Sequence, residues 1–209
     1  MNFKTKYSRL TYSYLDLRKT VGWIGILLPF TLMFGLLILF NGEDMPTSIS
    51  HYYHTSMRNV FVGALCAVAL FMFFYCGYNK LDDWAGNIAG FFAIGVAWVP
   101  TTEGVGETDL IGLIHYTCAA IFFLTLASFS LILFTKTKKE FKITSRKKKR
   151  NLVYRICGII IIVCLIAIVA HKKFEFHPYF VFWAETVALI AFGVSWLTKG
   201  GALYPDKKL

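Results

Sequence analysis

Six long blocks of apolar residues, separated by short polar segments, make up most of the chain. An apolar run of about 18 or more residues predicts a transmembrane helix, because about 20 residues rising 1.5 Å each cross the roughly 30 Å hydrocarbon layer of a bilayer. The alternation with a period of two that a membrane barrel strand requires is absent. The blocks therefore predict six membrane-spanning helices, at residues 21–40, 60–78, 84–100, 110–134, 152–170 and 179–197.

The predicted fold class is all-α, an integral membrane bundle of six transmembrane helices that forms one domain over residues 1–209. Hydrophobic residues make up 56% of the chain and charged residues only 16%, and the connections between the apolar blocks are short, so no soluble domain is expected. The first block is expected to be a retained span rather than a cleaved signal peptide, because a mostly polar segment precedes it and no small-residue cleavage site follows. All five cysteines lie inside predicted spans, so we expect buried thiols rather than disulfides.

Positive charge is concentrated on one side of the predicted membrane. Lys and Arg accumulate in cytoplasmic loops, and a cytoplasmic N-terminus puts nineteen of the 22 Lys and Arg residues on the inner side. We therefore expect the N-terminal segment 1–19, the basic loop 136–151 and the tail 199–209 to be cytoplasmic, so that both termini lie inside. The expected location is the inner (cytoplasmic) membrane of a bacterial cell, crossed several times.

Nine of the fifteen residues from 136 to 150 are Lys or Arg. This loop is expected to act mainly as a topology signal, and contact with anionic lipid headgroups at about 1 kcal/mol per basic residue is a second expectation. The net charge of +10 comes largely from this loop, so it does not indicate a nucleic-acid partner. Membrane lipids are the expected partners, and the sequence leaves the oligomeric state open.

Small and special residues predict how some spans pack. Gly86 and Gly90 lie four residues apart, which lets a neighbouring backbone approach closely and predicts that the third span is the tightly packed central helix. Asp83 is expected to cap the start of that helix, and Pro178 to begin the last one. Pro29 is expected to bend the first span.

All five histidines are predicted to lie at or beside the outer ends of spans, and polar candidates gather around them. Ser50, His54 and Arg58 are spaced by four and would share one face of a helix. Glu185 lies about two turns inside the last predicted span, where an ionised carboxylate costs about 3 kcal/mol unless it is paired. Arg58 and His115 are its expected partners, either in a structural bridge or in a polar pocket, and a helix–helix or subunit contact is the remaining alternative. The candidate catalytic residues are Glu185, His115, His54, Ser50 and Arg58.

A zinc site is one hypothesis for the histidines. His54, His115 and either His171 or His177 would supply three ligands, with Glu185 as a ligand or general base. The spacing is not diagnostic, because neither H-x-x-x-H nor H-E-x-x-H occurs, and histidines at helix ends more often form hydrogen bonds. The cofactor is therefore open, with zinc expected before a single haem.

Several motifs carry a resemblance to known families. The stretch 48–63, the segment 87–90, Pro100-Thr101 and the ending 185–200 resemble a family of uncharacterised bacterial multi-span membrane proteins, a domain of unknown function. That resemblance implies a membrane fold over nearly the whole chain and no known activity. The serine four residues before His54 is similar to the ceramidase and progestin-receptor-like superfamily, which implies metal-dependent hydrolysis. The paired H-x-x-x-H and the seventh span of that superfamily are missing here.

Three functions follow from these patterns and stay open at this point. The first is a metal-dependent lipid hydrolase that works from a His/Arg/Glu pocket open to the extracytoplasmic side. The second is a proton- or ion-coupled transporter, channel or sensor, because histidines titrate near pH 6.5. The third is a non-catalytic structural membrane protein. The sequence does not decide whether the protein is an enzyme.

Overall fold

A computed structural model describes residues 3–40, 43–102, 109–137, 143–174 and 176–205. These residues form six long α-helices and contain no strand, which confirms the all-α prediction. A short 3-10 helix, η1, precedes α2, and a π-helical segment, η2, continues α4. The elements are α1 (Phe3–Leu39), η1 (Ser50–His54), α2 (Arg58–Phe73), α3 (Lys80–Trp98), α4 (Leu110–Ser128), η2 (Phe129–Leu133), α5 (Ser145–Phe174) and α6 (Phe180–Lys199).

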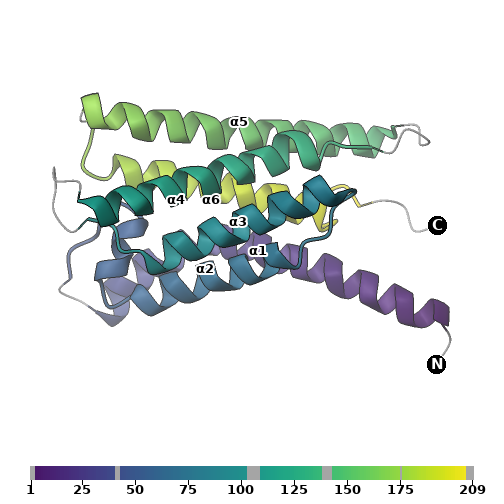
Figure 1. Cartoon of the computed structure of the whole chain (residues 1–209), viewed down its shortest axis with the longest axis horizontal. Coiled ribbons are helices and arrows are strands. Elements are labelled where there is room, and N and C mark those ends of the chain that lie inside the picture. The colour runs from purple at the N-terminus through teal and green to yellow at the C-terminus, as the bar shows by residue number, and fades with distance from the viewer. Residues whose placement is uncertain (1–2, 41–42, 103–108, 138–142, 175, 206–209) are drawn as a thin grey trace.

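Successive helices run back and forth along one bundle, as Figure 1 shows. One end carries η1, the start of α4, the end of α5 and the start of α6, and we call it the histidine end because all five histidines lie there. The opposite end carries the start of α1, the end of α6, the connection at 74–79 and the described residues at 134–137 and 143–144, and we call it the lysine end. The start of α1 and the end of α6 therefore share one end of the bundle, and the first turns of α1 project beyond the other helices (Figure 1).

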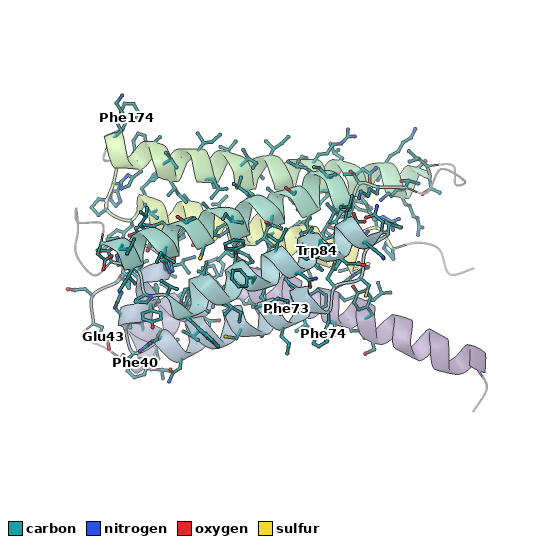
Figure 2. All side chains as sticks on the ribbon, in the orientation of Figure 1. Phe40, Glu43, Phe73, Phe74, Trp84 and Phe174 are labelled. Carbon is teal, nitrogen blue, oxygen red and sulfur yellow. The ribbon has the colours of Figure 1, made fainter. Side chains whose placement is uncertain are left out.

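The outer surface of the bundle is apolar, as expected for contact with lipid. Four helices are long and apolar enough to cross a membrane, over Ser13–Leu39, Leu110–Leu133, Ser145–His171 and Phe180–Lys199, and Arg58–Phe73 is a shorter apolar helix. Aromatic side chains project from the bundle at Phe73, Phe74, Trp84 and Phe174 (Figure 2), and each is more than two-fifths exposed. Exposed apolar and aromatic side chains of this kind are typical of a membrane protein.

The central helix of the bundle is α6 rather than α3, which corrects the expectation from Gly86 and Gly90. Helix α6 packs against both α1 and α5, and eleven of its 20 residues are buried, whereas α3 packs against α2 and α4 and has seven of its 19 residues buried. Trp196 of α6 is fully buried and lies edge-on to Phe71, with ring centroids 5.3 Å apart. Trp84 and Trp98 of α3 are both 64% exposed, so one face of α3 points outward.

Glycines set the closest helix contacts. A Cβ on Gly22 of α1 would lie 2.8 Å from the carbonyl oxygen of Gly193 in α6, and a Cβ on Gly193 would lie even closer to the Gly22 oxygen. A Cβ on Gly86 of α3 would lie 2.7 Å from the Met72 oxygen of α2. The close approach predicted for Gly86 is therefore confirmed, with α2 as the neighbour.

Several helix boundaries differ from those the apolar blocks predict. Helix α1 begins at Phe3, so most of the polar segment 1–19 is helical, and α5 begins at Ser145, inside the predicted basic loop 136–151. Asn79 caps α3 by accepting a hydrogen bond from Asp82, in place of the cap expected at Asp83. Helix α6 begins at Phe180, two residues after Pro178. Charged residues continue these helices beyond their apolar blocks, which apolar runs alone do not reveal.

Candidate functional site

A 3-10 helix forms the centre of the histidine end. Its C-cap residue, Thr55, is extended, with φ −115° and ψ 171°, so the helical path breaks before α2 begins at Arg58. Ser50, His54 and Arg58 therefore do not share one helix face as predicted. The Arg58 guanidinium lies 4.0 Å from the centre of the Tyr53 ring and donates a hydrogen bond to the Tyr53 hydroxyl.

Main-chain N–H groups hold the carboxylate of Glu185. The Ile49 N–H donates to Oε2 at 2.6 Å, and the Ser50 backbone also hydrogen-bonds to this carboxylate. These N–H groups belong to the first turn of η1, where a helix leaves its donors unpaired. Glu185 thus anchors η1 to α6, in place of the Arg58 or His115 partner expected from the sequence. Among the described residues, Lys19–Asp16 and Lys136–Asp82 are the ion pairs, and neither includes Glu185.

Two further contacts fix the segment before and within η1 on α6. The Phe182 N–H donates to the Thr47 oxygen at 2.9 Å. Tyr52 is fully buried, with its ring centroid 6.2 Å from that of Phe182. Its hydroxyl is buried with no hydrogen-bond partner among the described residues. Aromatic packing rather than polar bonding therefore holds Tyr52 in place.

Three histidines bind the segment between α3 and α4. His54 Nε2 lies 2.7 Å from the Thr101 oxygen, and His115 Nδ1 lies 2.7 Å from the Val99 oxygen. His51 Nδ1 lies 2.6 Å from Ser48 Oγ, and a hydrogen bond also joins His51 to the Thr102 backbone. The structure thus brings the predicted residues His54 and His115 together, and His51, which was not among the candidates, joins them.

Burial lowers the pKa of His51 below its usual value of 6.5, and the neighbouring His54 lowers it further. A neutral ring with its proton on Nε2 fits both contacts: Nε2–H donates to the Thr102 oxygen, and Nδ1 accepts from the Ser48 hydroxyl. Ser48 Oγ in turn accepts the His51 backbone N–H at 3.2 Å. Neutral His51 therefore completes a network that ties η1 to the 99–102 segment.

The remaining histidines form local contacts. His171 Nδ1 accepts the Phe176 N–H at 3.2 Å, and its ring stacks on Phe180 with centroids 5.3 Å apart. His177 Nδ1 accepts the Tyr179 N–H at 3.2 Å and is exposed. Within the part of the chain that is described, which includes every histidine, no three His, Cys, Asp or Glu side chains form a group that could hold a metal ion. The predicted zinc ligands are thus not assembled by these residues.

A cavity of about 570 Å³ lies between α4, α5, α6 and the segment leading into η1. Most of its wall is apolar, and its polar residues come mainly from the histidine end. Leu124 of α4 and Val169 of α5 line it and are also 49% and 72% exposed, so the cavity opens between these two helices. The apolar lining residues are Ala119, Ala120, Phe123, Leu124, Leu165, Ile166, Ile168, Val169 and Val181, and the polar ones are Thr47, Ser48, Ser50, His51, Tyr116, His171 and Glu185.

A second cavity, of about 650 Å³, lies on the other side of η1 and is more polar. His54, Arg58 and Asp109 line it together with Thr101 and Thr102. The predicted site residues are therefore divided: Ser50, Glu185 and His171 line the apolar cavity, whereas His54 and Arg58 line the polar one. His115 lines neither of these two cavities, and its buried Nε2 has no partner among the described residues.

Comparison with protein families gives one match, which spans residues 30–200 and so covers both cavities and all five histidines. The matching model is described as a family of unknown function, DUF7103. The chain belongs to the DUF7103 family. No curated protein and no solved structure matches the chain. The comparisons thus support the resemblance to an uncharacterised family and give no support to the ceramidase-like similarity or to a bacterial source.

Sequence reasoning missed Ser48 and His51 of this DUF7103 protein. Both line the apolar cavity, and they contact each other, whereas the chosen pair Ser50 and His54 is split between the two cavities. The available signal was a serine three residues before a histidine, since a serine at the start of a helical turn accepts the backbone N–H three residues later.

Proposed function

We propose that this protein is a multi-pass membrane protein that binds an amphiphile, a lipid with an apolar chain and a hydrogen-bonding headgroup. The observation that carries the proposal is the cavity between α4, α5 and α6, whose wall is apolar and whose polar residues gather at the histidine end. Its volume of about 570 Å³ lies within the roughly 300–1,000 Å³ typical of small-molecule sites. The apolar wall matches the chain of an amphiphile, and the polar residues at the histidine end match its headgroup.

The opening between α4 and α5 supports lateral entry from the bilayer. Leu124, Ile166 and Val169 line the cavity and are each about half exposed or more, so they face the surrounding acyl chains. An apolar chain that enters there exchanges one apolar environment for another, and little hydrophobic free energy changes. Affinity must then come from close packing and from the headgroup contacts.

The headgroup contacts favour a ligand that donates hydrogen bonds. A carboxylate has about four acceptor positions, and the Ile49 and Ser50 amides of the protein use only two of those of Glu185. A hydroxyl or amine headgroup can use the others, whereas an anionic headgroup would be repelled by an ionised Glu185. The proposed ligand class is therefore a lipid with a hydroxyl or amine headgroup.

Binding fits this site better than acyl transfer does. Ser48 Oγ and His51 Nδ1, 2.6 Å apart, have the geometry of a nucleophile and its base. The main-chain amides of Ile49 and Ser50 are occupied by Glu185, and that of His51 is occupied by Ser48 Oγ, so none of the three is available to stabilise an oxyanion. Removal of one oxyanion donor costs a factor of about 10²–10³ in rate. We therefore assign the Ser48–His51 pair to headgroup binding and to the position of η1.

Blocking the cavity tests this function. Ala119→Phe adds a ring inside the cavity, and Ala67→Phe adds the same ring to an exposed position on α2 that lines none of the cavities described above. We expect the lipid that copurifies with the wild-type protein, measured by mass spectrometry, to be lost from Ala119→Phe and retained by Ala67→Phe. Equal retention by both variants would contradict amphiphile binding in this cavity.

The membrane arrangement is also a proposal. We infer six membrane crossings, with the lysine end in the cytoplasm and the histidine end outside, in the cytoplasmic membrane. The charge distribution supports this orientation, because nineteen of the 22 Lys and Arg residues belong to segments at the lysine end. The amphiphile cavity then opens to the outer half of the bilayer.

A further inference from the structure

Basic side chains from three helices gather at the lysine end of the bundle, far from the cavity already described. Lys199 of α6 is partly buried, and the charges of Arg18, Lys147 and Arg150 act on its ammonium group. Asp82 is the opposing charge that acts on Lys199, and it is already paired with Lys136. Three cations thus surround a fourth, and the nearby carboxylate has its own partner.

Aromatic rings contact three of these cations, Arg18, Lys147 and Lys199. Lys199 Nζ lies 5.1 Å from the Phe134 ring centre and 5.4 Å from that of Tyr78. Lys147 Nζ donates to the Phe134 oxygen at 2.8 Å, so Phe134 touches both amines. The Arg18 guanidinium lies 4.4 Å from the Tyr14 ring centre. Stacking on rings fixes the positions of the charges while leaving N–H donors available for an anion.

Two of these cations have few polar contacts within the described residues. Lys199 has cation–π contacts there and no hydrogen bond or ion pair, and the buried Nε of Arg18 has no hydrogen-bond partner. Like charges held together in partly buried positions repel each other, because the low dielectric strengthens the interaction. A bound anion would remove this repulsion and accept the N–H donors.

We propose that this basic cluster, formed by Arg18, Lys147, Arg150 and Lys199, binds a phosphate-bearing anion. Arg and Lys are the residues that bind phosphate groups, Arg through paired N–H donors and Lys as a point charge. The cluster lies where α1, α5 and α6 reach the lysine end, so a phospholipid headgroup can reach it from the membrane and a soluble phosphate from the aqueous phase. This site is separate from the amphiphile cavity and does not depend on its function.

Ligand-induced stabilisation of the full chain in detergent tests the proposal. The probes are phosphatidic acid in mixed micelles, phosphatidylcholine in the same micelles, and sodium pyrophosphate in solution. A ligand at about a hundredfold excess over its Kd should raise the unfolding midpoint of a chain of this size by about 5–10 °C. We expect this rise with phosphatidic acid and none with phosphatidylcholine.

Variants assign the rise to the cluster. Arg18→Gln and Lys199→Gln, separately and together, should reduce and then abolish it, whereas Lys19→Gln, which removes a neighbouring charge paired with Asp16, should leave it unchanged. A rise with pyrophosphate that the double variant also abolishes would support the same site with a soluble ligand. Absence of any rise with either phosphate probe, or a rise that survives in the double variant, would overturn the proposal.

Discussion

The main-chain amides of η1, rather than a basic side chain, hold the Glu185 carboxylate in this protein. Hydrogen bonds to a charged group contribute about 1.5–3 kcal/mol each, roughly twice the value for neutral pairs. One carboxylate can therefore anchor a five-residue helix to α6 without an ion pair. The same group leaves acceptor positions for a ligand in the cavity, so one residue links the fold to the proposed site.

Glu185→Gln tests that anchor. The amide can accept one N–H, but its own NH₂ then faces the second N–H, so the variant should lose about 1–3 kcal/mol of stability. Glu43→Gln is the matched control, because exposed Glu43 accepts from the Ser56 N–H at 3.2 Å, and it should cost less than about 1 kcal/mol. Thermal unfolding in detergent compares the two, and equal losses would show that Glu185 does not anchor η1.

Two neighbouring tyrosines should respond oppositely to the loss of a hydroxyl. Tyr52 buries a hydroxyl without a partner, whereas the Tyr53 hydroxyl donates to the Trp98 oxygen at 3.3 Å and accepts from Arg58. Tyr52→Phe removes the cost of a buried unpaired group, about 1–3 kcal/mol, and should stabilise the protein. Tyr53→Phe should destabilise it by about 1 kcal/mol. Thermal unfolding midpoints of the two variants test these opposite changes. A loss of stability in Tyr52→Phe would show that its hydroxyl has a partner.

At this scale the sequence indicated the unusual residue but not its partner. Glu185 stands out because a carboxylate is costly among apolar residues of a span. Its partners are backbone N–H groups, which every non-proline residue carries and which no residue pattern distinguishes. The spacing of Ser50, His54 and Arg58 was misleading for a related reason, because the extended conformation of Thr55 interrupts the helix that the spacing assumed.

Among the contacts between helices, the one between α1 and α6 depends on two facing glycines. Gly22 and Gly193 let the two backbones approach until the carbonyl oxygen of each faces the Cα of the other. Helices in a membrane associate through packing rather than the hydrophobic effect, so small residues determine how closely they pack. Because α6 is the central helix, this contact fixes the bundle that carries both proposed sites.

A single methyl group tests the contact. Gly193→Ala places a Cβ against the Gly22 oxygen and should cost about 1–3 kcal/mol, because backbone must shift to make room. Gly63→Ala is the control: a Cβ there meets nothing within 4 Å, and the better helix propensity of Ala should add about 0.5–1 kcal/mol. The unfolding midpoints should therefore move in opposite directions. A stabilising Gly193→Ala would contradict the close approach.

The positions of the helices were predictable from the sequence, whereas the pairs of helices that pack against each other were not. Most of every predicted apolar block is helical, as expected because an unpaired backbone is too costly in lipid for any other structure. The apolar blocks do not reveal which helices are neighbours in the bundle. Gly86 and Gly90 therefore identified a close contact, but they did not show that α6 occupies the centre. The short helix η1 has no apolar period of its own, and it forms because α6 and the 99–102 segment bind it.

For the whole molecule, the two ends of the bundle differ in charge and in what they can bind. The histidine end carries hydrogen-bonded histidine rings and an apolar cavity, and the lysine end carries clustered cations. Separation of this kind is expected for a protein that lies across a membrane, because the cytoplasmic side collects basic residues. Charge counts in the sequence predicted the separation, whereas the cavity depends on how three helices pack.

The stability of the whole protein should depend on pH through His51. Its pKa is lower in the folded protein than its ordinary value of 6.5, so below about pH 6.5 the unfolded chain binds a proton that the folded one excludes. The contribution of His51 to stability should thus fall as the pH drops through this range. His51→Gln should make the pH profile of the unfolding midpoint less steep, and the exposed His177→Gln should not. A flat wild-type profile would contradict a buried neutral His51.

Cysteine labelling tests the orientation of the bundle. An impermeant maleimide applied to intact cells should label Ser56→Cys, at the histidine end, and should label Lys148→Cys, at the lysine end, only after the cells are opened. Both side chains are exposed, so accessibility to solvent is matched. The reverse pattern would invert the proposed topology.

Photocrosslinking locates the proposed ligand most directly. A long-chain alcohol with a photoreactive group in its tail is incubated with the protein in detergent, irradiated and mapped by peptide mass spectrometry. The account predicts crosslinks to the cavity walls on α4 and α5 that disappear in Ala119→Phe and persist in Ala67→Phe. Crosslinks spread over the outer surface, or unchanged by Ala119→Phe, would contradict the account.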